Sequence, residues 1–198
     1  MEPRGERPAS AAVLMLVLLG ALWILEFVDQ LSGNRLDDFG IHTRELDGLG
    51  EIFTAPFLHA GWDHLISNSV AFLVLGFLVL LGGLARWLLS SLISIVSSGL
   101  AAWLLTPANT IVLGASGLIF GWLTYLLARA IWSRRLAQVL IAVGVLVVYG
   151  GMIWGVLPTN SQISWQAHLG GAIGGVIAAR VIHRRNSPRP ALANARYR

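Results

Sequence analysis

Four polar side chains in apolar surroundings could do chemistry in this sequence. Ser116 lies in the run GASG, His168 in AHLGG, and His64 and Asn68 in WDHLISN. A serine hydroxyl becomes a nucleophile when a histidine takes its proton, and imidazole titrates near neutral pH. His64 and Asn68 can donate hydrogen bonds to the oxyanion that forms. These residue types predict nucleophilic catalysis, with Ser116 as nucleophile and His168 as general base.

The distribution of acidic residues limits the form of that catalysis. All ten lie at or before Asp63, so the second two thirds of the chain contain no carboxylate side chain. The acid that orients the histidine in an ordinary triad is therefore absent near His168. The sequence predicts a Ser–His dyad, and we expect packing against Phe120, one helical turn after Ser116, to hold the imidazole.

The composition is that of a membrane protein. The 198 residues are 56% hydrophobic and 12% charged, with a mean hydropathy of +0.70, whereas soluble domains carry about a quarter charged residues. There is no cysteine, which excludes disulfides and thiolate chemistry. All 14 basic residues are arginines in short clusters between apolar runs, an arrangement typical of topology signals rather than of nucleic-acid binding.

The elements that must position these residues are membrane-spanning helices, which need roughly 20 apolar residues each. The sequence predicts an all-α polytopic membrane protein, a six-helix bundle over 9–183 between an N-terminal tail 1–8 and a basic C-terminal tail 184–198. The six predicted spans are 9–28, 62–81, 87–105, 114–132, 136–157 and 165–183.

Arginine placement predicts the orientation of the bundle, since arginines concentrate in cytoplasmic connections. We therefore expect both termini in the cytoplasm and the long loop 29–61 outside, partly embedded through its apolar run GLGEIFTAPFLHAGW. The charge-free stretch 158–164 should belong to the outer cap over the site. The arginines that flank the inner connections are Arg4, Arg7, Arg86, Arg129, Arg134, Arg135, Arg180, Arg184, Arg185 and Arg189.

The polar residues fall at similar depth in three alternate spans. Each has an ordinary structural explanation when taken alone, such as a hydroxyl bonded to a backbone carbonyl, but ionisable residues inside spans usually face a cavity or one another. We expect Gly114 and Gly117 to let backbone approach a substrate. Gly117 and Gly121 should also pack against a neighbouring span, most simply the last one, which carries Gly171 and Gly175.

Taken together, these motifs resemble those of the rhomboid intramembrane serine proteases. The matching elements are HAGWDHLISN, GASG and AHLGGAIGG, and the resemblance covers 9–183. It implies that Ser116 is the nucleophile and His168 the base, that His64 and Asn68 contribute to the oxyanion hole, and that His59 is structural. It also implies single-pass transmembrane protein substrates, cleaved near the outer membrane face, without a cofactor or metal.

Two positions depart from the family pattern. A Trp-Arg pair is common in the first loop of rhomboids, and here the corresponding place reads Gly50-Glu51. We therefore expect a different set of bonds inside that loop. Phe120 stands where a tyrosine often occurs, so ring stacking is kept and the hydroxyl is lost. Neither change touches the predicted dyad.

Two other classes of function are weighed against the protease. A zinc hydrolase could use His59, Asp63, His64 and His168, but the i,i+5 spacing of the first two histidines does not share a helix face and no HExxH motif occurs. A non-catalytic rhomboid-like protein that binds transmembrane clients, or a transporter, is the alternative. Transporters often show internal repeats and midplane ionisable sites, and the sequence shows neither. A bacterial inner membrane is the expected location, with membrane lipids and no nucleic acid as surroundings.

Overall fold

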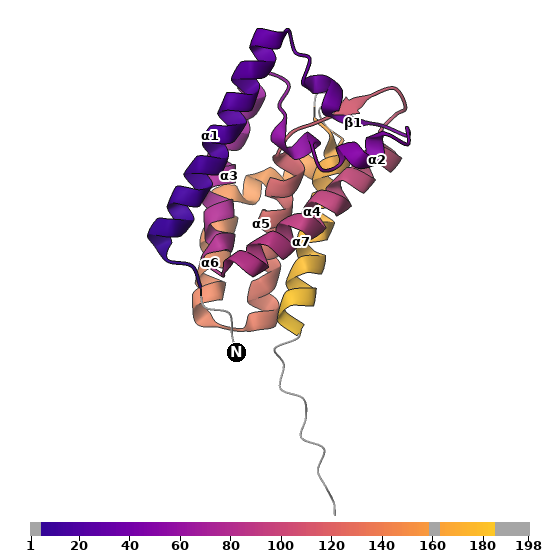
Figure 1. Cartoon of the computed structure of the whole chain (residues 1–198). Helices are drawn as coiled ribbons and strands as arrows, with labels where there is room; N and C mark the ends of the chain where they lie inside the picture. Colours follow the sequence, from indigo (N-terminus) through magenta and orange to yellow (C-terminus); the bar gives the residue numbers. More distant parts are fainter. Residues whose placement is uncertain (1–4, 159–162, 185–198) are drawn as a thin grey trace, which may run out of the picture.

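The chain folds as a bundle of long α-helices, drawn in Figure 1. The computed structural model describes residues 5–158 and 163–184. This architecture confirms the all-α polytopic fold that the sequence predicts. The long helices among the described residues are α1 Pro8–Ser32, α3 Trp62–Leu80, α4 Leu84–Leu105, α5 Ser116–Ser133, α6 Leu136–Tyr149 and α7 Trp165–Arg184.

Each predicted span coincides with one long helix, although the ends differ by a few residues. α1 continues to Ser32, where Gly33 ends it in a left-handed conformation with φ 74°, so the outer loop starts later than residue 29. Of the stretches expected as tails and cap, residues 1–4, 159–162 and 185–198 lie outside the described part of the chain.

The fifth predicted span, 136–157, is present as the apolar helical segment Leu136–Val156, but its helix type changes along its length. α6 ends at Tyr149, and a 3₁₀-helix, η3 Gly150–Val156, continues the chain. Adjacent glycines at 150 and 151 weaken the α-helix, and a 3₁₀-helix advances about 2.0 Å per residue instead of 1.5 Å. This narrower segment packs against the first turns of α7.

α5 and α7 pack with their backbones in direct contact. A Cβ on Gly171 would collide with the carbonyl oxygen of Gly117, and one on Gly175 would collide with that of Gly121. Small residues allow such close approach in membrane helices, where van der Waals packing drives association. Gly117 and Gly121 lie between two helices: their backbone meets α7, and Cβ atoms on them would meet Ser98 and Ser94 of α4.

Interhelical hydrogen bonds fasten α7 on both sides. From α4, Ser97 Oγ donates to the carbonyl of Gly170 at 2.7 Å, and Ser98 Oγ donates to that of Ala167 at 2.9 Å. From α5, Thr124 Oγ1 donates to the carbonyl of Ala172 at 2.7 Å. These hydroxyls satisfy their own polarity inside the bundle, and they hold the N-terminal part of α7, which carries His168.

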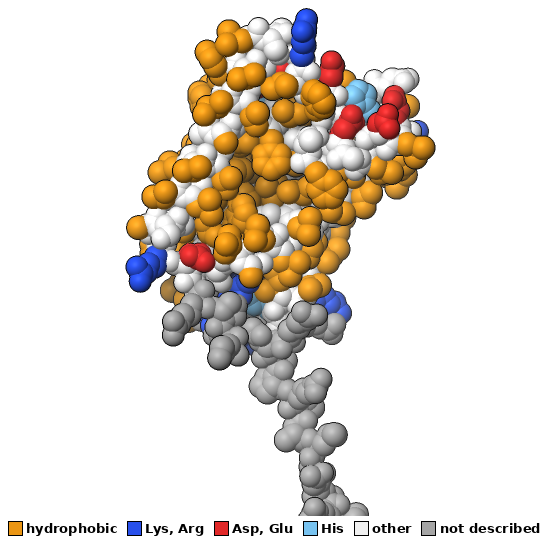
Figure 2. Space-filling model, in the orientation of Figure 1, with side chains coloured by type: hydrophobic (Ala, Val, Ile, Leu, Met, Phe, Trp, Pro, Cys, Tyr) orange, Lys and Arg blue, Asp and Glu red, His pale blue; other side chains and the backbone are white. Residues whose placement is uncertain are grey.

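The surface is consistent with a membrane environment. On the face drawn in Figure 2, hydrophobic side chains cover the middle of the bundle and most charged side chains lie at its two ends. By length and composition, α1, α3, α4 and the segment Leu136–Val156 are able to span a membrane. α5 and α7 contain several glycine and polar residues. α5 is mostly buried among its neighbours, whereas α7 buries one side and leaves Ile173, Val176 and Ile177 exposed on the other.

The first loop is ordered and pairs with the connection before α5. Two strands pair antiparallel, with Ile41 opposite Val112 and His42 opposite Ile111. They lie at one end of the bundle, in the upper part of Figure 1. The short elements of this region are η1 Asp37–Phe39, β1 Ile41–His42, α2 Gly48–Glu51, η2 Ala55–Phe57 and β2 Ile111–Val112.

Candidate active site

Ser116 is the first residue of α5, and the turn before it is tied to the segment that leads into α3. The N–H of Gly114 donates to the carbonyl of Ala55 at 2.9 Å, and the N–H of Ala115 donates to His59 Nε2 at 3.5 Å. Gly114 has φ +123°, a conformation that glycine adopts without strain. Since N–H groups in the first turn of a helix have no intrahelical partner, the serine hydroxyl lies next to free backbone donors.

His168 and Ser116 are joined by a direct hydrogen bond. His168 Nε2 lies 2.8 Å from Ser116 Oγ, and His168 Nδ1 lies 2.9 Å from the carbonyl oxygen of Gly155. A carbonyl oxygen only accepts, so Nδ1 carries the proton and Nε2 offers its lone pair to the serine hydroxyl. The backbone of η3 thus selects the tautomer that a general base requires.

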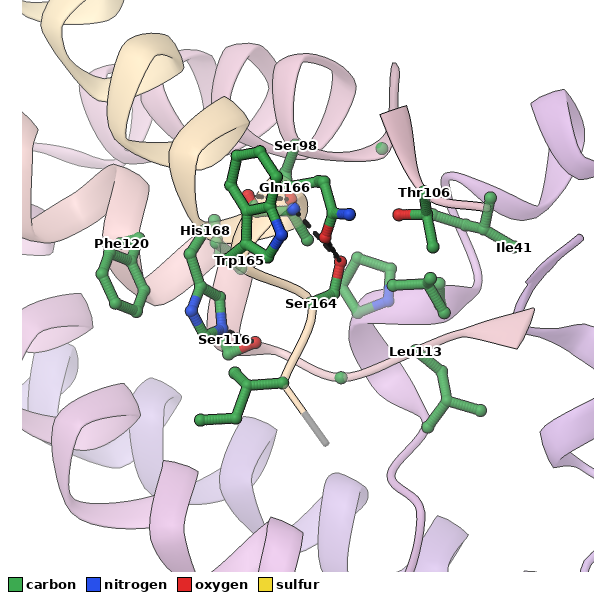
Figure 3. Close-up of a pocket in the computed structure, with 18 of the residues that line it drawn as sticks. Ile41, Ser98, Thr106, Leu113, Ser116, Phe120, Ser164, Trp165, Gln166 and His168 are labelled. Carbon is green, nitrogen blue, oxygen red and sulfur yellow. Dashed lines mark hydrogen bonds between the residues drawn. The ribbon is translucent and has the colours of Figure 1, made fainter. Parts of the chain in front are cut away.

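Phe120 supports the imidazole from the other side. Its ring stacks on His168 with centroids 4.2 Å apart and planes 12° apart. Figure 3 shows His168 between Phe120 and Ser116. The imidazole is therefore held by one stacking contact and two hydrogen bonds.

Gly155 is a site residue that the sequence reasoning missed. A Cβ at this position would lie 2.8 Å from Phe120 Cζ and 3.3 Å from His168 Nδ1, so a side chain here would displace both rings. Its functional atom is a backbone carbonyl, which residue type does not reveal. The available signal was a third glycine near the end of an apolar span, after Gly150 and Gly151.

His64 and Asn68 face the same cleft from α3. The N–H of Ala60 donates to His64 Nδ1 at 3.4 Å, which leaves Nε2 as the protonated nitrogen. Asn68 is buried, and its Nδ2 has no hydrogen-bond partner among the described residues. An unsatisfied buried amide is costly, so Asn68 presents a donor that a bound oxygen would satisfy.

The cleft in front of the dyad has a volume of about 1230 Å³. Its lining joins the polar groups Ser116, His168, His64 and Asn68 to an apolar wall. Figure 3 shows this wall reaching from the dyad toward Ile41 and Leu113 near the paired strands. The cleft is large enough for several residues of an extended peptide. Its apolar wall residues include Ile41, Ile52, Val112, Leu113 and Ile163.

The geometry agrees with comparisons to known proteins. A profile of the rhomboid domain matches residues 47–185 of the chain. The chain belongs to the rhomboid family. An uncharacterised Mycobacterium tuberculosis protein is 41% identical over 176 residues, which cover 85% of this chain and 73% of that protein. An uncharacterised Mycobacterium leprae protein is 39% identical over 178 residues, covering 86% and 70%. A rhomboid-like chloroplast protein of Arabidopsis thaliana is 34% identical over 145 residues, covering 64% and 50%.

The first loop of this rhomboid contains a bond that the sequence did not predict. One Glu51 oxygen accepts from the backbone N–H of His42 at 2.8 Å, and both lie 2.9 Å from His42 Nδ1. The side-chain hydrogen bond with Glu51 is the largest of the effects that raise the pKa of His42 above its usual value. Glu51, which stands where many rhomboids carry arginine, therefore cross-links β1 to α2.

Gly117 corrects one expectation. Its missing Cβ would collide with Ser98 Oγ of α4, and it would lie 3.3 Å from the carbonyl oxygen of Ala167. Gly117 therefore serves helix packing and does not face the cleft. Gly114 does face it, because a Cβ there would lie 2.5 Å from His64 Cε1.

The histidines are not arranged as a metal centre. Among the described residues, no group of three or more His, Cys, Asp or Glu side chains could hold a metal ion. His59 Nε2 accepts from the N–H of Ala115, and its ring meets that of His64 edge to face with centroids 5.1 Å apart. This geometry gives no support to the zinc hydrolase alternative.

Proposed function

We propose that this protein is an intramembrane serine endopeptidase that cleaves single-pass transmembrane proteins near the outer membrane face. The observation that carries the proposal is the 2.8 Å contact between His168 Nε2 and Ser116 Oγ, combined with the bond from His168 Nδ1 to the carbonyl of Gly155. Together these bonds prepare a hydroxyl for deprotonation. Membership of the rhomboid family supports the same reaction class.

The reaction begins when Ser116 Oγ attacks the scissile carbonyl carbon as His168 Nε2 takes the hydroxyl proton. His168 then gives this proton to the leaving amine, and an acyl-enzyme ester remains on Ser116. Water, deprotonated by the same nitrogen, hydrolyses the ester and restores the serine. The carbonyl of Gly155 accepts from Nδ1–H throughout, so the imidazole keeps its orientation in both protonation states.

The negative charge of the tetrahedral intermediate develops next to three kinds of donor. Asn68 Nδ2 lacks a partner among the described residues, His64 Nε2 carries a proton that faces the cleft, and Ser116 offers the N–H of a helix start. Donors fixed in advance of the reaction stabilise the oxyanion without reorganising. The buried amide of Asn68 gains its missing bond only when this oxygen is present.

The substrate class follows from the position of the cleft within a membrane-spanning bundle. A peptide bond inside a helix is shielded by its own side chains, so a transmembrane substrate must unwind locally before its carbonyl reaches Ser116. Helix-weakening residues beyond the cleaved bond favour this step, and small residues at that bond let its carbonyl carbon approach Ser116. The apolar wall beside the paired strands then suits an extended, membrane-derived segment.

The proposed setting is a bacterial inner membrane, with both termini in the cytoplasm. Arginines flank the connections on one side of the predicted bundle. Of the opposite connections, 106–113 and 158–164 carry no charge, and 29–61 carries two arginines against six acidic residues. The two mycobacterial relatives support a bacterial location. In this orientation the dyad faces the outer leaflet.

The test is cleavage of a transmembrane reporter in proteoliposomes that contain the purified protein. We expect wild type to release the reporter's outer part and Ser116→Ala to release none. Asn68→Ala should lower the cleavage rate by about 10²–10³, the cost of losing one oxyanion donor. Ser67→Ala is the matched control, since Ser67 lines the same cleft but its hydroxyl already donates to the carbonyl of His64 at 2.7 Å.

The outcome that would contradict the proposal is cleavage that survives in Ser116→Ala, or a wild type that binds the reporter and cuts nothing under any lipid condition. The second result would favour the non-catalytic client-binding alternative. Equal losses in Asn68→Ala and Ser67→Ala would remove the oxyanion role from Asn68.

A further inference from the structure

A second polar cluster lies at the far end of α5, away from the dyad. Arg129 follows Ser116 by thirteen residues, which at 1.5 Å per residue places it about 20 Å along the helix. Its side chain is only 3% exposed. In Figure 1 the ends of α5 and α7 lie at the end of the bundle opposite β1 and α2.

Arg129 is a buried cation without an acidic partner among the described residues. The ion pair that the described residues form joins His42 and Glu51, at the other end of the molecule. Arg129 Nε has no hydrogen-bond partner among the described residues, and the guanidinium of Arg129 lies 5.7 Å from the centroid of the Tyr125 ring. Because buried charges are normally paired, this position calls for an anion. Glu6, a described acidic residue whose neighbour Gly5 lies against Leu81, forms no ion pair with Arg129.

Further cationic groups surround Arg129 from neighbouring elements. Arg86 of α4 and Arg129 meet beside Gly82, where a Cβ would lie 3.5 Å from Arg129 Nη1 and 3.9 Å from Arg86 Cδ. Arg86 Nη1 donates to the carbonyl of Gly82 at 3.2 Å. Tyr125 Oη lies 3.4 Å from His183 Nε2. Arg86 is half-buried and Arg135 is exposed, so the cluster has a buried floor at Arg129 and a rim that reaches the surface.

We propose that this cluster binds the phosphate group of an anionic phospholipid. Guanidinium groups bind phosphate oxygens in a bidentate manner, and basic pockets between transmembrane helices are typical headgroup sites. The lipid phosphate bridges Arg86 of α4 and Arg129 of α5 beside α7, the three helices that fix His168. A bound lipid therefore stabilises the same helix contacts that hold the dyad, from the opposite membrane face.

The experiment measures thermal unfolding of the delipidated full-length protein in a neutral detergent. Phosphatidylglycerol, phosphatidylcholine and inorganic phosphate are titrated separately into wild type, Arg86→Gln, Arg129→Gln and Arg180→Gln. Arg180 is the matched control, since it is an exposed arginine of α7 near the same end of the bundle. A ligand that binds only the folded state raises Tm in a saturable way.

We expect phosphatidylglycerol to raise Tm with saturation and phosphatidylcholine to have much less effect. Arg86→Gln should raise the half-saturating concentration about fivefold, the effect of one basic residue on an anionic lipid, and Arg129→Gln at least as much. Arg180→Gln should match wild type. If Arg129→Gln does not fold, the response of Arg86→Gln to phosphatidylglycerol decides whether the site exists. Arg86 reaches the surface, so its substitution should not prevent folding.

Equal responses to the two lipids, or equal losses in Arg86→Gln and Arg180→Gln, would overturn the site. If inorganic phosphate saturates the site at the same concentrations, the ligand is not specifically a lipid. The site would then be a phosphate site, provided that the same two arginines are needed. The readout is binding rather than proteolysis, so the result is independent of the proposed protease activity.

Discussion

α6 and α7 are consecutive long helices of the chain, but α6 is largely exposed and α7 packs closely against its neighbours. Only 6% of the segment Leu136–Val156 is buried inside the protein, and Gly144 of α6 has nothing within 4 Å of where a Cβ would be. On α7, Gly171 and Gly175 meet the backbone of α5. His168 lies on α7, the helix clamped by these contacts. A general base, the role that we propose for His168, must be held within tenths of an ångström of its nucleophile.

The largest effect should come from adding one methyl group to α7, the clamped helix. A Cβ in Gly171→Ala meets backbone, which cannot move aside as a flexible side chain can. We expect it to destabilise the protein by about 1–3 kcal/mol, as overpacking does, and to lower reporter cleavage by displacing His168. Thermal unfolding and cleavage rate are measured on the same preparation.

Gly144→Ala is the control, with the same change of residue on the exposed helix. We expect full activity and unchanged or slightly higher stability, because alanine favours a helix by up to about 1 kcal/mol over glycine. Similar losses in the two variants would break the comparison between the clamped and the exposed helix.

A smaller effect is expected for the hydroxyl groups that fasten α7. Ser97→Ala removes the donor to the carbonyl of Gly170, and interhelical hydrogen bonds in membranes are worth about 0.6 kcal/mol on average. Ser10→Ala, at an exposed position of α1, should leave unfolding unchanged. A denaturant or thermal series on both variants checks this, and a loss in Ser10→Ala as large as in Ser97→Ala would contradict it.

The smallest effect is expected for the ion pair of Glu51 and His42 in the first loop, because both side chains are partly exposed to solvent. Glu51→Gln keeps an oxygen for the backbone N–H of His42 and removes the charge. Because the folded pKa of His42 is raised, the stabilisation is fully present below the unfolded value of about 6.5. It is lost as pH rises through the folded pKa. Because a partly exposed ion pair contributes little, the free energy of unfolding of Glu51→Gln should differ from that of wild type by less than about 1 kcal/mol.

A pH series of unfolding temperatures for wild type and Glu51→Gln tests this sign. The difference between the two proteins should be largest near pH 6 and should shrink toward pH 9. A difference that grows with pH would mean that the ion pair does not form as described. High salt should also reduce the difference, since exposed charges are screened.

The sequence predicted the helices and the candidate site residues because polar groups in apolar spans are costly and therefore conspicuous. Ser116, His168, His64 and Asn68 could be chosen without coordinates because each interrupts an apolar run at the same end of its span. The spacing of Gly117 and Gly121 placed them on one face of their helix, and the structure sets that face against both α7 and α4.

The remaining features depend on backbone atoms and on distant contacts. The carbonyl of Gly155 selects the tautomer of His168, but a carbonyl belongs to every residue, and its position depends on the change from α6 to η3. The bond between Glu51 and His42 requires the β1–α2 turn. Gly117 faces α4 instead of the cleft because of how the helix is rotated, which glycine spacing alone does not determine.

The central claim is that His168 activates Ser116, and adduct mapping tests it most directly. The purified protein is treated with a fluorophosphonate and the modified peptide is located by mass spectrometry in wild type and His168→Ala. We predict one adduct on Ser116 and labelling at least about a hundredfold slower in the variant, the usual contribution of a general base. An adduct on another residue, or a Ser116 adduct that forms equally fast without His168, would contradict the account.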